Sequence, residues 1–214
     1  MIGIIDYGMG NLRSVLKAFE KTGHAAQIIQ TPQELRDAVA LVLPGVGAFR
    51  DCIKNLETHS LIAPLLQSIR AGKPFLGICL GLQILFSESE EFGTTTGLNV
   101  IKGRVVRFPI RPPQSSAHSE MRLKIPHMGW NAITIHKRPP CLQDIPDESF
   151  FYFVHSYYVL PEDPQVVAAT TEYGITFASA VWKDNIVAVQ FHPEKSQTLG
   201  LHIIKQFGEW ALQN

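Results

Sequence analysis

The residues with the clearest chemical potential are a cysteine, a histidine and a glutamate that lie far apart in the sequence. Cys79 sits at the centre of residues 77–81 (GICLG), and His192 and Glu194 flank a proline. A thiol, an imidazole and a carboxylate can serve in acyl transfer as the nucleophile, the base and the group that orients the base. We therefore interpret the two segments together as a candidate catalytic triad.

The sequence around Cys79 predicts a nucleophile on a tight turn between a strand at 75–78 and a helix at 80–86. Gly77 and Gly81 would let neighbouring backbones pass close by. The helix dipole would favour the thiolate, and the N–H of Leu80 would lie where it can stabilise an oxyanion. The alternative interpretation is an inert buried cysteine, because free cysteines are commonly buried.

His192 follows a predicted strand at 186–190 and precedes a proline, which favours extended backbone. Side chains two residues apart in an extended segment face the same way, so Glu194 is expected to contact one imidazole nitrogen. The other nitrogen would then face a thiol. The alternative is a strand-end turn with a solvated glutamate. Because Cys79 and His192 both follow core strands, we expect them at the same edge of one sheet.

Alternating hydrophobic patterns predict an α/β fold with a central, mostly parallel mixed sheet flanked by helices, in a single domain spanning 1–214. The second half predicts an added antiparallel portion with tight turns at 172–174 and 183–185. Residues 109–119, rich in proline and serine, predict a surface loop. The expected strands are 2–6, 25–30, 41–44, 75–78, 100–108, 130–135, 150–160, 166–171, 176–182 and 186–190. The expected helices are 12–21, 49–56, 61–70, 80–86 and 198–212.

Composition narrows the class of protein. The 214 residues carry 19 basic and 19 acidic side chains, which argues against an electrostatic grip on nucleic acid or an anionic membrane. Cys52, Cys79 and Cys141 have irregular spacing, so we expect neither a disulfide framework nor a zinc site, and a reducing, cytoplasmic compartment. The start predicts no signal peptide. Residues 7–10 (YGMG) lack the third glycine of a dinucleotide fingerprint, and no cofactor is expected.

Taken together, these motifs resemble those of the class I glutamine amidotransferases over almost the whole chain. Residues 77–83 (GICLGLQ) are similar to the nucleophile motif of that family, 192–194 to its histidine–glutamate pair, and 44–49 (PGVGAF) to its oxyanion strand. The resemblance implies a three-layer fold, L-glutamine as substrate and a glutamyl thioester on Cys79. It further implies an oxyanion hole from Leu80, Gly45 and Val46, and glutamine contacts from Gly47, Gln83, His155, Ser156 and Tyr157.

Four further segments resemble the glutaminase subunits of imidazole glycerol phosphate synthases: 6–11 (DYGMGN), 126–131 (PHMGWN), 153–158 (FVHSYY) and 192–196 (HPEKS). This resemblance implies a heterodimer with a (β/α)8-barrel cyclase subunit. The cyclase would use the ammonia to form imidazole glycerol phosphate and an aminoimidazole carboxamide ribotide in L-histidine biosynthesis. The implied interface residues are Asn11, Trp130, Tyr152 and Lys195. Leu82 stands where anthranilate-type and GMP-type relatives usually carry histidine.

Three other functions remain open at the level of sequence. Another class I amidotransferase, or a free-standing amidase, would have the same triad but a different partner or none. A non-catalytic scaffold would not need all three triad residues. A redox-sensing cysteine protein would react with peroxide rather than glutamine, and would leave residues 44–49 unexplained.

Overall fold

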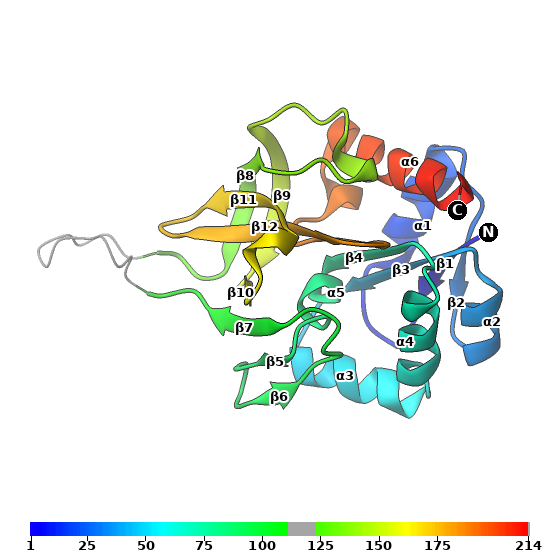
Figure 1. Cartoon of the computed structure of the whole chain (residues 1–214). Coiled ribbons are helices and arrows are strands. Elements are labelled where there is room, and N and C mark those ends of the chain that lie inside the picture. Colours follow the sequence, from blue (N-terminus) through cyan, green and yellow to red (C-terminus); the bar gives the residue numbers. More distant parts are fainter. Residues whose placement is uncertain (111–122, 214) are drawn as a thin grey trace, which may run out of the picture.

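The computed structural model describes residues 1–110 and 123–213, and a mixed β-sheet forms its centre (Figure 1). Five strands run parallel in the order β2-β1-β3-β4-β13. Every residue of β1, β3, β4 and β13 is buried, as expected for parallel strands covered on both faces. The bounds are β1 Ile2–Ile5, β2 Ala26–Ile29, β3 Ala40–Gly45, β4 Phe75–Cys79 and β13 Ile186–Val189.

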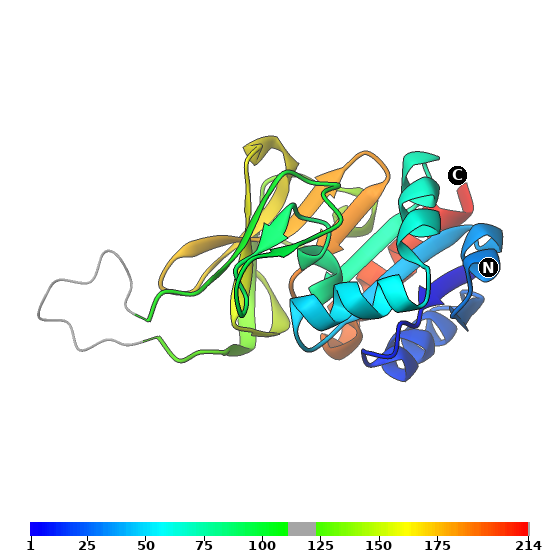
Figure 2. The ribbon, with the colours of Figure 1, turned by 90° about the horizontal axis from the view of Figure 1, so that it is seen from below.

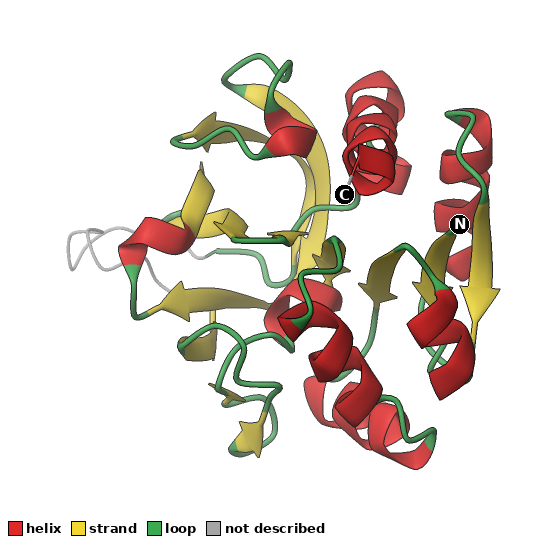
Figure 3. Ribbon diagram, turned by 45° about the vertical axis from the view of Figure 1, so that its right-hand side comes forward, coloured by secondary structure: helices red, strands yellow, loops and turns green. Residues whose placement is uncertain are grey.

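Helices cover both faces of the parallel strands, which confirms the predicted α/β fold (Figure 3). On one face α1 (Leu12–Lys21) and α6 (Gln197–Gln213) pack together, with Phe19 and Phe207 edge to face in the core. The other face carries α2 (Pro32–Asp37), α3 (Phe49–Thr58), α4 (Ile62–Arg70) and the short α5 (Leu80–Gln83). Among the described residues, no helix is long and apolar enough to cross a membrane.

The second half of the sheet is largely antiparallel and extends away from both chain termini (Figures 1 and 2). It starts where β12 pairs antiparallel with β13, and the predicted hairpin turns at 172–174 and 183–185 are confirmed. Its strands are β5 Glu88–Ser89, β6 Thr95–Thr96, β7 Gly103–Arg107, β8 His127–Ile135, β9 Ser149–His155, β10 Tyr157–Pro161, β11 Val167–Glu172 and β12 Thr176–Lys183. The described residues also contain the 3₁₀ turns η1 Pro140–Leu142, η2 Pro164–Val166 and η3 Pro193–Lys195.

Two predicted elements are wrong in their extent. The helix expected at 80–86 ends at Gln83, because the carbonyls of Ile84, Leu85 and Phe86 accept from N–H groups of residues 98–101 instead of from a further helical turn. A helix of one turn has only a small dipole, so the expected effect on the thiolate is weaker than the sequence suggested.

The strand expected at 150–160 is two strands divided at Ser156. β9 pairs with β8, whereas β10 pairs with β7 and β12, so the chain changes partners between them. The helix α2 was not predicted, although Thr31 and Glu34 form a capping box and Pro32 occupies the first turn. The short strands β5 and β6 were not predicted either. The loop expected at 109–119 falls mostly on residues 111–122, outside the described residues.

Candidate active site

Cys79 ends β4 in the sharp turn that its flanking glycines predict. Its φ of +55° and ψ of −104° are strained for a non-glycine residue, at a cost on the order of 1–3 kcal/mol. A Cβ on Gly81 would lie 1.8 Å from the Leu43 carbonyl oxygen, and one on Gly77 would lie 2.7 Å from the Gly81 oxygen. The turn therefore depends on both glycines, and it places the thiol at the end of the parallel sheet.

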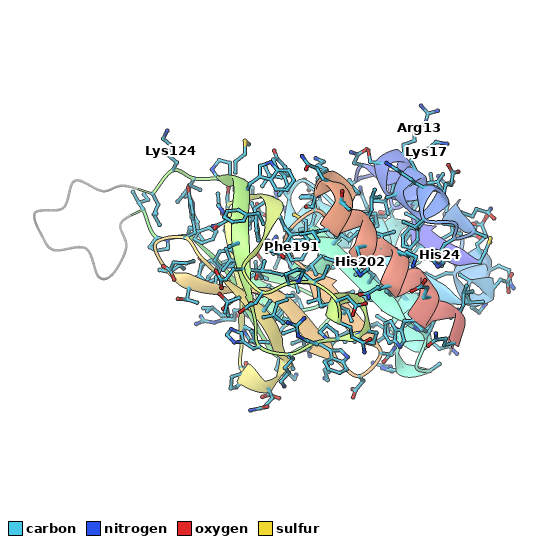
Figure 4. All side chains as sticks on the ribbon, turned by 90° about the horizontal axis from the view of Figure 1, so that it is seen from above. Arg13, Lys17, His24, Lys124, Phe191 and His202 are labelled. Carbon is cyan, nitrogen blue, oxygen red and sulfur yellow. The ribbon has the colours of Figure 1, made fainter. Side chains whose placement is uncertain are left out.

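His192 and Glu194 make the predicted hydrogen bond, with 2.8 Å between Nδ1 and Oε1 and both side chains 2% exposed. The backbone at His192 is extended as expected, but Glu194 lies in the 3₁₀ turn η3. The contact between Glu194 and His192 was predicted correctly, but the extended backbone expected at Glu194 was not. Phe191 anchors this segment by stacking on Phe151 of β9, 4.3 Å between ring centroids (Figure 4).

His192 lies close to Cys79 because β13 pairs directly with β4. Burial alone lowers the pKa of His192, but the Cys79 thiol and the Glu194 carboxylate outweigh burial and raise that pKa well above its usual value. Nδ1 is occupied by Glu194, which leaves Nε2 for the sulfur. Nε2 makes no hydrogen bond in the structure, yet the Cys79 thiol is among the groups that raise the pKa of the imidazole. This arrangement favours the cationic form of His192 once Nε2 has taken the thiol proton.

A cavity of about 310 Å³ lies in front of Cys79. Its lining contains all five residues predicted to contact glutamine, namely Gly47, Gln83, His155, Ser156 and Tyr157, together with Val46 and Leu80 of the expected oxyanion hole. Gly45 pairs in register with Cys79 at the end of β3. The structure therefore brings these residues to one place from β3, α5 and the β9–β10 junction.

The expected oxyanion segment is closely packed from behind. Leu80 is the first residue of α5, so its N–H has no acceptor within the helix. Tyr7 donates its hydroxyl to the Pro44 carbonyl at 3.1 Å, and a Cβ on Gly45 would lie 2.4 Å from that hydroxyl oxygen. Gly47 has a φ of +96°, and a Cβ there would meet the Met9 side chain. Gly45 and Gly47 therefore leave the space that Tyr7 and Met9 occupy behind the expected oxyanion segment.

Two polar residues at the site were missed by the sequence analysis. Gln190 is fully buried, and its Nε2 lies 3.5 Å from Cys79 Sγ. Glu91 lines the cavity and accepts from the Phe49 N–H at 2.7 Å, at the start of α3. Glu91 belongs to no motif. Gln190 stands two residues before His192, and that proximity was the only signal in the sequence.

Two buried imidazoles, those of His155 and His127, form a hydrogen-bonded chain that starts at the cavity lining. His155 Nδ1 donates to the Tyr157 carbonyl at 2.8 Å, so its Nε2 must accept from His127 Nδ1 at 3.0 Å. His127 Nε2 then accepts from Asn131 Nδ2 at 3.2 Å. Burial lowers the pKa of His127 to about 4 and that of His155 to about 3. Both rings are therefore neutral at pH 7, and the end carbonyl fixes both tautomers.

These neutral rings predict a loss of stability in acid. In the unfolded chain His127 binds a proton below about pH 6.5, whereas in the folded chain it stays neutral down to about pH 4. The free energy of unfolding should therefore fall by about 1.4 kcal/mol per pH unit for each such group. Urea unfolding of the chain and of His127→Gln between pH 4 and 7 checks this. We expect a shallower slope in the variant, and equal slopes would contradict the assignment.

The four expected interface residues lie at or near the outer surface. Trp130 and Tyr152 are cross-strand partners on β8 and β9, edge to face at 6.2 Å, and the Lys195 ammonium lies 5.8 Å from the Tyr152 ring centroid. Asn11 precedes α1, and its side chain makes no capping hydrogen bond. Tyr152 also touches the catalytic segment, because its carbonyl accepts from the His192 N–H at 2.9 Å.

Comparison with known proteins gives a consistent result. The family model of glutamine amidotransferase class-I matches residues 3–209. A protein of Geobacter sulfurreducens is 55% identical over 97% of this chain and 98% of its own length. One of Syntrophotalea carbinolica is 57% identical over 98% of this chain and 100% of its own length. Both are named imidazole glycerol phosphate synthase subunit HisH.

Solved structures share the fold at low sequence identity. A structure described as a glutamine amidotransferase covers 98% of this chain and 98% of its own, with a TM-score of 0.72 and 17% identity. PurLQS from Thermotoga maritima covers 99% of this chain and 97% of its own, with a TM-score of 0.70 and 15% identity. The predicted three-layer fold class is confirmed by these neighbours.

Proposed function

Because the chain belongs to the glutamine amidotransferase class-I family, we propose that it is the glutaminase subunit of an imidazole glycerol phosphate synthase. It hydrolyses L-glutamine to glutamate and ammonia, and a partner subunit consumes the ammonia in histidine biosynthesis in the cytoplasm. The single observation that carries the glutaminase assignment is the convergence of Cys79, His192 and Glu194 beside a cavity lined by amide, imidazole and carboxylate groups. The specific subunit rests on the relatives. Residues 1–214 act as one domain.

Glutamine fits the chemistry of the cavity. Glu91 supplies the one charged side chain among the described lining residues, which suits the α-ammonium group of an amino acid. Ser156 and Tyr157 add polar groups to the lining that can hydrogen-bond a bound amino acid. A cavity of about 310 Å³ is of the size that small-molecule sites have.

The reaction begins at the sulfur. His192 Nε2 takes the thiol proton, and the Cys79 thiolate attacks the side-chain amide carbon of glutamine. The tetrahedral intermediate places negative charge on oxygen, where the N–H of Leu80 and the backbone at Gly45 and Val46 stabilise it.

Collapse of the intermediate releases ammonia. His192 returns the proton to the leaving nitrogen, which leaves a glutamyl thioester on Cys79. His192 then takes a proton from water, and the resulting attack on the thioester releases glutamate and restores the thiol. Glu194 holds the imidazole by Nδ1 and stabilises its cationic form throughout.

The outer face of β8 and β9 is the proposed partner surface. Met128, Trp130 and Phe150 are 62%, 46% and 58% exposed there, and exposed apolar clusters mark binding sites. Lys195 borders this surface, and Arg13 and Lys17 project from α1 (Figure 4). A (β/α)8-barrel cyclase seated there would contact Tyr152, which holds the His192 backbone. Asn11 lies at the end of the loop that packs behind Gly45 and Gly47.

The proposal is tested by glutamate release. The purified chain is mixed with the cyclase subunit of the same organism and its nucleotide substrate, and glutamate is measured over time. We expect hydrolysis that increases when both are present, together with formation of imidazole glycerol phosphate. Absence of hydrolysis under every condition would refute a glutaminase. A rate of hydrolysis that is the same with and without the cyclase would instead support a free-standing amidase.

Substitution of Trp130 by alanine is expected to weaken cyclase binding by about 10- to 100-fold, because central interface tryptophans contribute about 1–3 kcal/mol or more. Leu212→Ala is the control, since Leu212 is 66% exposed at the end of α6. Titration calorimetry measures both dissociation constants. Equal affinities for the two variants would show that the partner docks elsewhere.

A further inference from the structure

Gln190 contacts the sulfur of the nucleophile, yet the triad mechanism gives it no part. Its Nε2 lies 3.5 Å from Cys79 Sγ, and its side chain is fully buried at the end of β13. A buried amide costs free energy unless its hydrogen bonds are made. The hydrogen-bond partners of this amide determine whether its NH₂ group or its oxygen faces the sulfur.

A neighbouring amide fixes the orientation of Gln190. A backbone carbonyl can only accept, so the end of Gln83 that lies 3.0 Å from the Tyr157 oxygen must be its NH₂ group. The same Nε2 donates to Gln190 Oε1 at 3.1 Å. The opposite end of Gln190 is then its NH₂ group, and this is the end that meets Cys79. The donor on the sulfur thus follows from the carbonyl of Tyr157 and not from a choice between two amide flips.

This arrangement changes the part of Gln83 as well. Both hydrogens of its amide are directed at Tyr157 and Gln190, so only Oε1 remains for a ligand. The sequence resemblance implied a glutamine contact, and the structure adds a second task. Gln83 orients the amide of Gln190, which donates a hydrogen bond to the Cys79 sulfur.

We propose that Gln190 is a fourth catalytic residue, an N–H donor that holds the Cys79 sulfur and stabilises its thiolate, and that Gln83 is the positioning residue that orients it. The proposal rests on the glutaminase function, because the thiolate is the form that attacks glutamine. The donor keeps its own hydrogens throughout. The thiol proton passes to His192 Nε2 when the carbon–sulfur bond forms. When water opens the thioester, the departing thiolate meets the same N–H.

The other contact of the sulfur shows why a donor is needed. The thiol donates to the Val154 carbonyl across 3.9 Å, and a carbonyl oxygen favours the protonated form of sulfur. Gln190 acts in the opposite sense, because a hydrogen bond to the charged form favours that form. Gln190 directly follows β13, on the segment that leads to His192.

The test follows alkylation of Cys79 by iodoacetamide from pH 5 to 10 and quantifies the labelled peptide by mass spectrometry. This readout needs neither glutamine nor a partner, so it fails or succeeds separately from the proposed function. In Gln190→Met we expect the half-maximal pH to rise by about one unit and the rate at pH 7 to fall about tenfold. Gln83→Met should give a smaller shift in the same direction. Gln190→Glu keeps the shape, places an acceptor on the sulfur, and should shift the profile at least as far.

Gln206→Met is the matched control, because Gln206 is a buried glutamine that bonds Asp144 rather than any residue of the site. It should leave the alkylation profile unchanged. Thermal melts identify any variant that does not fold. Because Gln190→Met and Gln190→Glu are both tested, the proposal can still be judged if one of them does not fold. A parental profile in a folded Gln190 variant overturns the proposal. In the complex, we expect a lower kcat for glutamine hydrolysis with an unchanged KM, since Gln190 does not line the cavity.

Discussion

Replacement of Cys79 by alanine is expected to lower glutamine hydrolysis by at least about 10⁴-fold, to the level of the solution reaction assisted by binding alone. No other described group near the cavity can form the thioester, because its lining contains one thiol. Glutamate release by the complex with the cyclase measures the loss. Binding of glutamine should persist, since the lining residues remain.

Cys141→Ala is the control for this experiment. Cys141 is fully buried in η1, and burial raises the pKa of its thiol to about 12, so it is a poor nucleophile at neutral pH. The variant should keep the parental activity. A glutamine analogue that carries an electrophile should label the parent at Cys79 alone. Full activity of Cys79→Ala would mean that the thiol is a bystander and would refute the thioester mechanism.

The sequence predicted the triad because each part of it depends on local chemistry. A cysteine between two glycines at the end of an apolar strand has few structures open to it, and the structure has the strained turn expected there. The expectation that Cys79 and His192 share one edge of the sheet followed from a general rule, that ligands bind at the carboxyl ends of parallel strands. The direct pairing of β4 with β13 was not predicted and comes from the structure. The residue assignments within the glutamine site came from the resemblance, and the structure places those residues around one cavity.

Apart from α2, whose capping box is a local signal, the main features that were missed depend on contacts distant in sequence. The early end of α5 is set by N–H groups of residues 98–101, which no pattern within 80–86 reports. The break at Ser156 occurs because β9 and β10 have different partners. Gln190 contacts Cys79, which lies 111 residues earlier, and is oriented by Gln83, which lies 107 residues earlier. Local periodicity and motifs cannot carry such information.

Substitution of Gly81 by alanine is expected to lower the free energy of unfolding by about 3 kcal/mol or more, or to prevent folding. Alanine suits a helix better than glycine by up to about 1 kcal/mol, so propensity alone predicts a gain. The steric clash outweighs this gain, so the net change in the free energy of unfolding is a loss. The new Cβ would lie 1.8 Å from the Leu43 carbonyl oxygen, and backbone cannot rotate away as a side chain can.

Relief of that clash has to move α5, because β3 is paired on both sides by β1 and β4. Such a movement carries Leu80 and the turn at Cys79 away from Gly45, so any folded variant should lose at least about 100-fold in glutamine hydrolysis. Gly72→Ala separates this effect from backbone strain. Gly72 has a φ of +87° with open space around it, so alanine there should cost about 1–2 kcal/mol and leave activity unchanged. Chemical denaturation and glutamate release measure both variants. If Gly81→Ala proved as stable and active as Gly72→Ala, the close approach of α5 to β3 would not be what positions the nucleophile.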